Sequence, residues 1–199
     1  MRKLSLGLVA LGANLASTAG SASETLQAAT NILHDGQDIT ITAVSRFWLT
    51  PADPPGAGPD YVNAAATIST LLSASQLLER LHRIEADFGR DRSGGRWSAR
   101  VLDLDLIAFD DMILPDMATL RNWINLPREA QLREAPNQLI LPHPRMQDRG
   151  FVLAPTAEIA PGWRHPLTGR SVIEMLAALG PDGTTGMHPL PTHSSAGFP

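Results

Sequence analysis

The sequence predicts an α+β fold of the ferredoxin-like βαββαβ type, with helices flanking one core sheet and long loops between the elements. Three observations support this prediction. Segments with the alternation or the apolar runs typical of strands are separated by two segments with helical spacing. Both helical segments open with a capping box, the Ser-x-x-Glu/Gln pattern that satisfies the first backbone N–H groups of a helix. The chain has 199 residues, 43% of them hydrophobic, which is enough for one domain with a sizeable core.

The first strand is expected over residues 4–11, a continuous apolar run suited to a central strand buried on both faces. A charged start followed by apolar and small residues is also typical of a signal peptide. The run is short, however, and Gly12 and Asn14 interrupt it, which favours the strand. A helix is expected next, because Ser21 and Glu24 have capping-box spacing. Its apolar stripe consists of Ala22, Leu26, Ala29 and Leu33.

Two further strands are expected from alternating patterns, over residues 39–43 and 61–70. Residues 50–59 between them are rich in Pro and Gly and are predicted to form a loop. Because residues two apart on a strand share a face, the side chains of Tyr61 and Asn63 should lie next to each other.

A second helix is expected from Ser73, with Gln76 completing its capping box and Gly89 suiting its C-terminal end. The buried face of this helix consists of Leu77, Leu78, Leu81, Ile84 and Phe88. A polar loop over residues 89–100 then leads into a strand over residues 101–109, which completes the βαββαβ order.

The C-terminal part of the chain is expected to add short helices. Residues 112–138 indicate one short helix, and residues 142–153 indicate a helical segment entered through proline. A last helix is expected over residues 171–179, because it begins with a capping box. The remaining residues, 180–199, are mostly Gly, Pro, Ser, Thr and His and are expected to be disordered. The sequence therefore predicts a single domain over residues 1–179.

Composition argues against several classes of protein. The net charge is −4, so no strongly basic field indicates a nucleic-acid partner. No apolar run approaches the ~20 residues that span a bilayer. The chain has no cysteine, which excludes disulfides and thiolate metal sites and allows a reducing compartment. These features agree with a cytoplasmic protein whose partners are small molecules. We also expect a monomer, although composition does not decide the oligomeric state.

The sharpest chemical signal is the run Leu102-Asp103-Leu104-Asp105-Leu106. On a strand the leucines enter the core and the two aspartates share the other face, with their Cα atoms roughly 6 to 7 Å apart. Like charges this close repel each other unless a cation lies between them. Carboxylate oxygens on a rigid strand suit Mg²⁺ together with substrate phosphates. A solvated strand face with two ordinary acids is the alternative interpretation.

The loop before this strand is rich in arginine and glycine. It contains Arg90, Arg92, Arg96 and Arg100 together with Gly89, Gly94, Gly95 and Trp97. Guanidinium groups bind phosphate in a bidentate manner, glycines allow the loop to move, and the indole could cover a ligand. A mobile cationic lid beside an acid pair suits phosphoryl-type transfer. A solvated basic loop or an RNA-contacting loop is the alternative.

Other signals are weaker alone. Residues 142–151 add cationic donors and one aromatic side chain. Tyr61 and Asn63 could bind a flat heterocycle by stacking and hydrogen bonding, although a plain surface is the alternative. The chain lacks the Gly-x-x-x-x-Gly-Lys-Ser/Thr loop and the protein-kinase signatures, so any ATP chemistry would use a different structural arrangement.

Taken in order, these segments resemble the 6-hydroxymethyl-7,8-dihydropterin pyrophosphokinase family over roughly residues 4–178. The matching segments are residues 11–15, 50–51, 59–64, 83–85, 89–90, 96–97, 100–105, 142–143 and 149–151. The most specific part is the Arg-Trp block joined to the Leu-Asp-Leu-Asp strand, followed by Pro-His and Arg-Gly-Phe. The resemblance implies transfer of pyrophosphate from ATP to a pterin alcohol in folate biosynthesis, with release of AMP.

The resemblance also implies roles for individual residues. Two Mg²⁺ ions would be held by Asp103 and Asp105. The co-substrate ATP would be bound by Glu85, Arg90, Arg92, Arg96, Trp97, Arg100, His143 and Arg149. The pterin would be bound by Gly12, Asn14, Thr50, Pro51, Tyr61, Asn63 and Phe151, with Tyr61 and Phe151 on the two faces of its ring. The residues expected to act in catalysis are Arg90, Arg92, Arg100, Asp103 and Asp105.

The sequence departs from the family pattern on the adenosine side. Residues 112–138 are longer than usual, Gln138 and Ile140 replace an expected basic residue and threonine, and Pro144 replaces an aromatic residue. Two other functions stay open: a ferredoxin-like RNA-binding module, and a metal-dependent nucleotidyltransferase that would release pyrophosphate. The acidic net charge and the single tyrosine argue against the RNA-binding module.

Overall fold

The computed structural model describes residues 3–52, 58–89 and 101–191, and it confirms the predicted ferredoxin-like α+β fold. The core sheet is antiparallel, with β1 between β5 and β4, and β2 on the other side of β4. Its strands are β1 (Ser5–Ala13), β2 (Ile39–Val44), β4 (Tyr61–Thr70) and β5 (Asp103–Phe109). Helix α1 (Ala22–Leu33) follows β1, and helix α2 (Ala74–Asp87) follows β4, which gives the order βαββαβ.

The strand β1 is central, as its apolar run predicted. It pairs with β4 along its whole length and with β5 from Gly7 to Gly12. Val9 and Leu11 belong to the core beneath α1 and α2, whereas Leu8 belongs to a second core on the opposite face. A strand buried on both faces needs apolar residues at consecutive positions, which explains why its pattern does not alternate.

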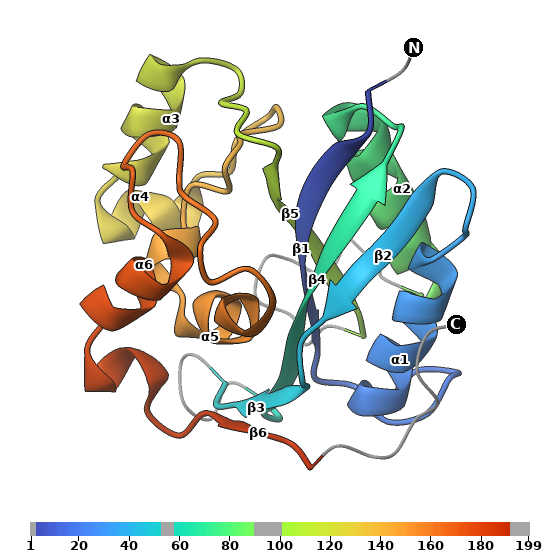
Figure 1. The fold of residues 1–199 in the computed structure, drawn as a ribbon. Helices are drawn as coiled ribbons and strands as arrows, with labels where there is room; N and C mark the ends of the chain where they lie inside the picture. Colours follow the sequence, from blue (N-terminus) through green and yellow to red (C-terminus); the bar gives the residue numbers. More distant parts are fainter. Residues whose placement is uncertain (1–2, 53–57, 90–100, 192–199) are drawn as a thin grey trace.

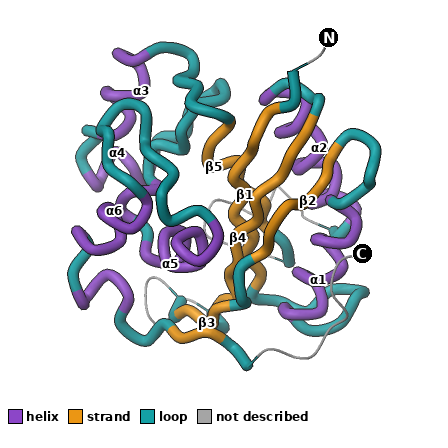
Figure 2. Tube along the Cα trace, viewed as in Figure 1, coloured by secondary structure: helices purple, strands orange, loops and turns teal. Residues whose placement is uncertain are grey.

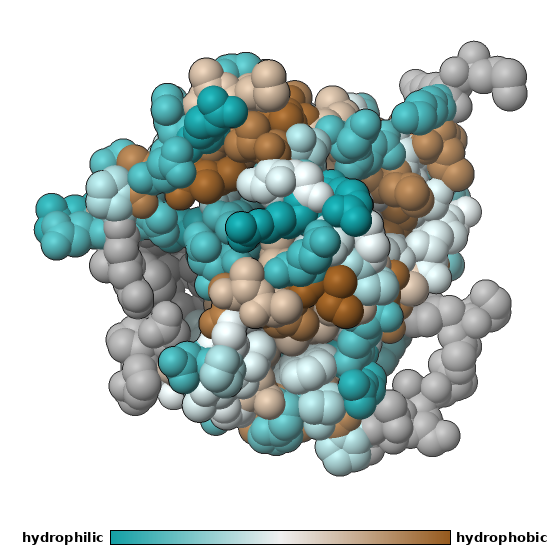
Figure 3. All heavy atoms as spheres, turned by 60° about the vertical axis from the view of Figure 1, so that its left-hand side comes forward, coloured by the Kyte–Doolittle hydropathy of each residue, from teal (hydrophilic) through white to brown (hydrophobic). Residues whose placement is uncertain are grey.

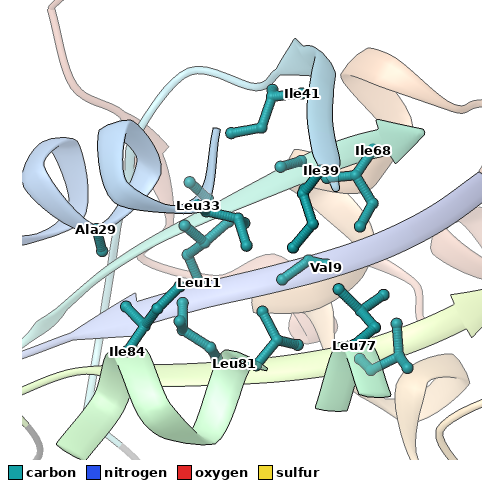
Figure 4. Packing of buried hydrophobic residues seen from close by; sticks show 14 of the residues in the cluster. Val9, Leu11, Ala29, Leu33, Ile39, Ile41, Ile68, Leu77, Leu81 and Ile84 are labelled. Atoms are coloured by element: carbon teal, nitrogen blue, oxygen red, sulfur yellow. The ribbon is translucent and has the colours of Figure 1, made fainter. Parts of the chain in front are cut away.

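Helices α1 and α2 cover one face of the sheet (Figures 1 and 2). Both predicted capping boxes are present, at Ser21 with Glu24 and at Ser73 with Gln76. Gly89 follows α2 with a φ of +82°, a conformation that glycine adopts without strain. The core between these helices and the sheet, shown in Figure 4, includes Leu33, Ile39, Ile68, Leu77 and Leu81.

The C-terminal half of the chain covers the other face, so the sheet lies between two helical layers (Figure 1). Helix α5 (Gly150–Ile159) packs against β4 and against α6 (Val172–Ala178). The core of this layer consists of Leu8, Ile107, Ala108, Met146, Val152, Leu153, Val172 and Met175. The remaining helices are α3 (Met117–Ile124), α4 (Arg128–Arg133), η2 (Met146–Asp148) and η3 (Pro181–Thr184).

The outer surface of this C-terminal layer is mixed in character. Figure 3 shows apolar residues in separate patches between hydrophilic ones, not in one continuous area. Within the described ranges, no helix is long and apolar enough to cross a membrane.

The structure corrects the prediction for three segments. The sequence predicts Thr50 in a loop, but Thr50 ends the short strand β3 (Trp48–Thr50), which pairs with β4. The helical segment expected from Pro142 starts only at Met146, with η2. Residues 112–138 contain a second helix, α4, besides the expected one.

The disorder predicted for residues 180–199 is wrong for residues 181–190. These residues form η3 and the two-residue strand β6 (His188–Pro189), which pairs with β3. Strands of two or three residues are stabilised by their partner strands, so they leave no alternation pattern in the sequence. Residues 192–199 of the predicted tail lie outside the described residues.

Candidate active site

A row of paired residues crosses the sheet and connects the predicted metal ligands with the predicted pterin residues. Asp103 on β5 pairs with Gly12 on β1, and Gly12 pairs with Asn63 on β4. Asn63 in turn pairs with Trp48 on β3. Residues paired on neighbouring antiparallel strands point to the same face of the sheet. Asp103 and Asn63 therefore share a face, with their Cα atoms two strand spacings, or roughly 10 Å, apart.

The site face of the sheet is the one covered by α5. Along β1, Gly12 and Leu8 lie four residues apart and so point to the same side. Leu8 belongs to the core that α5 and α6 form with the sheet. Side chains from α5 and from the segment before it are therefore available on the site face.

Gly12 is a glycine because the Asn63 side chain occupies the space above it. A Cβ atom at Gly12 would lie 2.8 Å from Asn63 Oδ1, which is closer than a real contact allows. The Asn63 side chain is buried at 7% exposure, and its Nδ2 donates a hydrogen bond of 2.7 Å to Thr50 Oγ1. Three of the predicted pterin residues thus form one contact cluster with a fixed amide orientation.

Two hydrogen bonds hold the described residues on either side of residues 53–57. Asn14 Nδ2 donates to the carbonyl oxygen of Pro59 at 3.1 Å, and the Ala52 N–H donates to Asp60 Oδ1 at 3.2 Å. Tyr61 follows directly and pairs with Thr50 across β3 and β4. Asn14 therefore shapes the site indirectly, by holding the chain that leads into Tyr61.

The two aspartates alternate with buried leucines as predicted. Leu102, Leu104 and Leu106 are 0%, 2% and 3% exposed. Asp103 and Asp105 are half-buried on the opposite side of the strand, where they pair with Gly12 and Ala10. Small residues on β1 leave the carboxylates uncovered by the neighbouring strand, so both can bind a ligand above the sheet.

Glu85 lies inside the protein, between α2 and the aspartate strand. It is 1% exposed, and its Oε1 accepts a hydrogen bond of 2.8 Å from the backbone N–H of Leu104. In the described sheet β5 pairs only with β1, so its outer edge needs other partners for its backbone groups. The structure thus gives Glu85 a supporting role beneath the aspartates.

His143 is held as a neutral imidazole near Asp103. The pKa of His143 is lowered to about 3, mainly by burial and also by the charges of Arg149 and Arg145, whereas the charge of Asp103 acts in the opposite direction. Its backbone N–H donates to the Ile107 carbonyl oxygen at 2.8 Å, and its Nδ1 accepts from the Arg145 N–H at 3.1 Å. Because Nδ1 is an acceptor, the proton of the neutral ring is on Nε2, which can donate to a phosphate oxygen.

Arg149 and Phe151 lie where α5 begins. The guanidinium carbon of Arg149 is 5.5 Å from the centre of the Phe151 ring, within cation–π distance. The Phe151 side chain is 37% exposed, which is unusual for a phenylalanine and leaves part of the ring available to a ligand.

Arg145 was not predicted as a site residue. Its Nη2 donates to the carbonyl oxygen of Gln131 in α4, and its charge acts on His143. Arg145 therefore links residues 112–138 to His143, which is predicted to bind phosphate. Its position two residues after His143 was the available signal. The predicted lid residues Arg90, Arg92, Arg96, Trp97 and Arg100 lie outside the described residues.

An apolar hollow of about 390 Å³ lies at the other end of the same sheet. Its lining includes Leu6, Leu8, Ala108 and Trp163, and none of the predicted site residues. We therefore place the candidate site on the paired row at Gly12 and not in this hollow, because only the row brings the acids, the amide and the imidazole together.

Replacing Glu85 by alanine should leave the Leu104 N–H without its acceptor. We expect Glu85→Ala to lower the unfolding free energy by about 1–3 kcal/mol, since a buried donor would lose its hydrogen bond. Glu79→Ala, an exposed change on the same helix, should cost within about 0.5 kcal/mol. Urea denaturation measures both values, and equal losses in the two variants would contradict the assigned contact.

The neutral state of His143 should make stability depend on pH. Below its unfolded pKa of about 6.5 the unfolded chain binds a proton that the folded chain rejects down to about pH 3. The unfolding free energy should therefore fall with falling pH, by up to ~1.4 kcal/mol per pH unit from this residue. His143→Asn should lose this part of the slope between pH 7 and pH 5; identical slopes would show that His143 takes up protons freely in the folded state.

Comparison with known proteins places the sequence in a family. The sequence profile of the 7,8-dihydro-6-hydroxymethylpterin-pyrophosphokinase (HPPK) family matches residues 8–161. The 2-amino-4-hydroxy-6-hydroxymethyldihydropteridine pyrophosphokinase of Pseudomonas aeruginosa is 36% identical over 170 residues, which cover 85% of this chain and 89% of that protein. The enzyme of the same name from Synechocystis is 41% identical over 118 residues, which cover 59% of this chain and 50% of that protein.

The fold also has relatives of known structure. The wild-type HPPK-DHPS protein of Plasmodium falciparum superposes with a TM-score of 0.61 at 11% identity, covering 89% of this chain and 45% of that one. The chain thus spans about half the length of the Plasmodium protein and of the Synechocystis relative. From the profile match and the identity to the Pseudomonas enzyme, we conclude that the chain belongs to the 7,8-dihydro-6-hydroxymethylpterin pyrophosphokinase family.

Proposed function

We propose that this chain transfers the pyrophosphate group of ATP to 6-hydroxymethyl-7,8-dihydropterin, with release of AMP, as a step of folate biosynthesis. The observation that carries the proposal is the paired row from Asp103 through Gly12 to Asn63. It puts an acid pair suited to a phosphate–metal complex on the same sheet face as an amide suited to a heterocycle edge. A transfer between the two substrates requires this proximity.

The pterin half of the site is formed by Asn63, Thr50, Tyr61 and Phe151. The Asn63 amide, oriented by Thr50, supplies donor and acceptor groups for the edge of the ring. Tyr61 and Phe151 supply aromatic faces for stacking, and the exposure of Phe151 is consistent with this role. Gly12 contributes space, because any side chain there would displace the amide.

The donor atoms of the phosphate half are carboxylate oxygens, which suit Mg²⁺. Asp103 and Asp105 provide two carboxylates, and within the described residues no cluster of three or more His, Asp or Glu side chains could hold a metal by itself. This suits ions that share the remaining positions with substrate phosphates and water. When bound, two Mg²⁺ ions would neutralise the triphosphate and polarise its phosphoryl oxygens. The Nε2–H of His143 and the guanidinium of Arg149 would add donors to the phosphate oxygens.

In the proposed reaction the hydroxymethyl oxygen of the pterin forms a bond to the β-phosphorus of ATP. The bond between the β-phosphorus and the oxygen shared with the α-phosphate breaks, and AMP leaves with that oxygen. His143 is not suited to accept the hydroxyl proton, because Nδ1 is occupied and Nε2 already carries a proton. We propose that a carboxylate of the aspartate pair accepts this proton. Because the site residues come from one chain, we propose that a single copy is active.

The products decide between the proposed reaction and the rival nucleotidyl transfer. The protein should convert ATP, Mg²⁺ and 6-hydroxymethyl-7,8-dihydropterin into AMP and the pterin diphosphate in equal amounts, as measured by chromatography. Release of free pyrophosphate with transfer of AMP to the pterin would contradict the proposal, as would the absence of any pterin-dependent AMP.

The aspartates can be tested one at a time. Asp103→Asn or Asp105→Asn should lower kcat by roughly 10³-fold or more, since the loss of a metal ligand removes several kcal/mol of stabilisation. Removing one of two neighbouring like charges should leave the fold intact. Asp111→Asn, an exposed acid just beyond β5, is the matched control and should keep wild-type kcat. Turnover near the wild-type value in either site variant would overturn the assignment.

A further inference from the structure

The C-terminal strap, which we define as residues 181–190, lies beyond the region that matches the family profile. It contains η3 and β6 and runs from α6 to the edge of β3, in red along the bottom of Figure 1. None of the site residues predicted from the sequence belongs to it. Its contacts nevertheless reach both sides of the proposed pterin half.

The first contact is with the start of α5. Gly150 lies between Arg149 and Phe151, and a Cβ atom there would overlap the carbonyl oxygen of Gly183. The Sδ atom of Met187 is 3.3 Å from the same point. The strap backbone therefore lies directly against Gly150, the residue before Phe151, at a distance that only glycine permits.

The second contact is with the chain that carries Thr50. Gly186 has a φ of +75°, and a Cβ atom there would lie 2.8 Å from Cγ of Pro51. Beyond it, β6 pairs with β3 through Leu49 and His188, and the Leu190 N–H donates to the Phe47 carbonyl oxygen at 2.7 Å. The strap is thus fixed to β3 by backbone pairing and to Pro51 by close packing.

We propose that Gly183, Gly186 and Met187 of the strap are positioning residues for the pterin. By contacting Gly150 on one side and Pro51 on the other, they set the separation between the Phe151 ring and the Thr50–Tyr61 wall. Aromatic stacking depends on ring separation, so a small change in this distance weakens binding of a flat heterocycle. This inference rests on the proposed function for the identity of the heterocycle, but not for the position of Phe151.

The contact with Pro51 reaches the pterin half alone, whereas Gly150 lies between Phe151 and Arg149, which is assigned to the proposed phosphate half. Among the described residues, no backbone hydrogen bond and no strand pairing joins residues 181–190 to Asp103, Asp105 or His143. A change at the Pro51 contact should therefore alter the KM for the pterin and leave the KM for ATP unchanged. A strap that only stabilised the fold would affect both substrates alike.

Gly186→Asn tests the contact with Pro51. Asparagine tolerates positive φ, so backbone strain should contribute little to the effect. Gly36→Asn is the matched control, since Gly36 has a φ of +68° and no atom within 4 Å of the point where a Cβ atom would lie. Gly186→Asn should raise the KM for 6-hydroxymethyl-7,8-dihydropterin by roughly three- to tenfold, with the KM for ATP within about twofold. Gly36→Asn should match the wild type.

A double-variant cycle tests whether the contact with Pro51 causes the rise in the pterin KM. In a Pro51→Ala background the Cγ atom is gone, so Gly186→Asn should raise the pterin KM less than it does in the wild type. An equal effect in both backgrounds, or an equal rise in the two KM values, would overturn the proposal. If Gly186→Asn does not fold, Met187→Ala, which removes the sulfur atom beside Gly150, is measured in its place. Its pterin KM should rise, and an unchanged pterin KM would overturn the proposal.

A spectroscopic measurement separates this inference from the proposed function. With 4-fluorophenylalanine incorporated, the Phe151 resonance is assigned by its loss in Phe151→Leu. The ¹⁹F signal of Phe151 should shift in Gly186→Asn and stay in place in Gly36→Asn, without any substrate. An unchanged signal overturns the strap's role even if the enzyme makes AMP. Absence of AMP from the wild type overturns the proposed function, and the fluorine signal then still decides whether the strap positions Phe151.

Discussion

The absence of a side chain at Gly12 is the constraint on which the site depends. β1 is the only described strand that pairs with both β4 and β5, so its residues lie between the acid pair and the pterin residues. At Gly12 the Asn63 amide comes within 2.8 Å of where a Cβ atom would be, and it is held there by Thr50. A larger residue would displace the amide from the position in which it is bonded to Thr50. The row thus joins the two proposed binding functions through one small residue.

The two helical layers hold this row from opposite sides. On the α2 side, Glu85 accepts a hydrogen bond from the Leu104 N–H. Leu104 lies between the two aspartates, so this bond holds β5 in place at that point. On the α5 side, His143 is held through its backbone and its Nδ1, and Phe151 begins the helix that packs on β4. Buried acceptors and backbone contacts fix these side chains before a ligand arrives, which lowers the entropy cost of binding and reaction.

Much of the fold and of the site could be predicted from local signals. The capping boxes at Ser21 and Ser73 give both core helices, and the Leu-Asp alternation gives the orientation of the acid pair. What could not be predicted depends on partners distant in the sequence. β3 is stable because it pairs with β4 and β6, and β6 is stable because it pairs with β3. The role of Glu85 depends on the edge of β5 that has no strand partner in the described sheet. The neutral state of His143 likewise arises from burial and from nearby arginines, which no spacing rule shows.

The most direct test of this account is the pterin KM of Gly12→Ala. The added Cβ would meet the end of a side chain and not backbone, so the amide can rotate away and the fold should survive. Rotation breaks the Asn63–Thr50 hydrogen bond, and we expect the KM for 6-hydroxymethyl-7,8-dihydropterin to rise by about tenfold or more, with the KM for ATP nearly unchanged. A folded Gly12→Ala variant with the wild-type pterin KM would contradict the claim that this glycine holds the two halves of the site together.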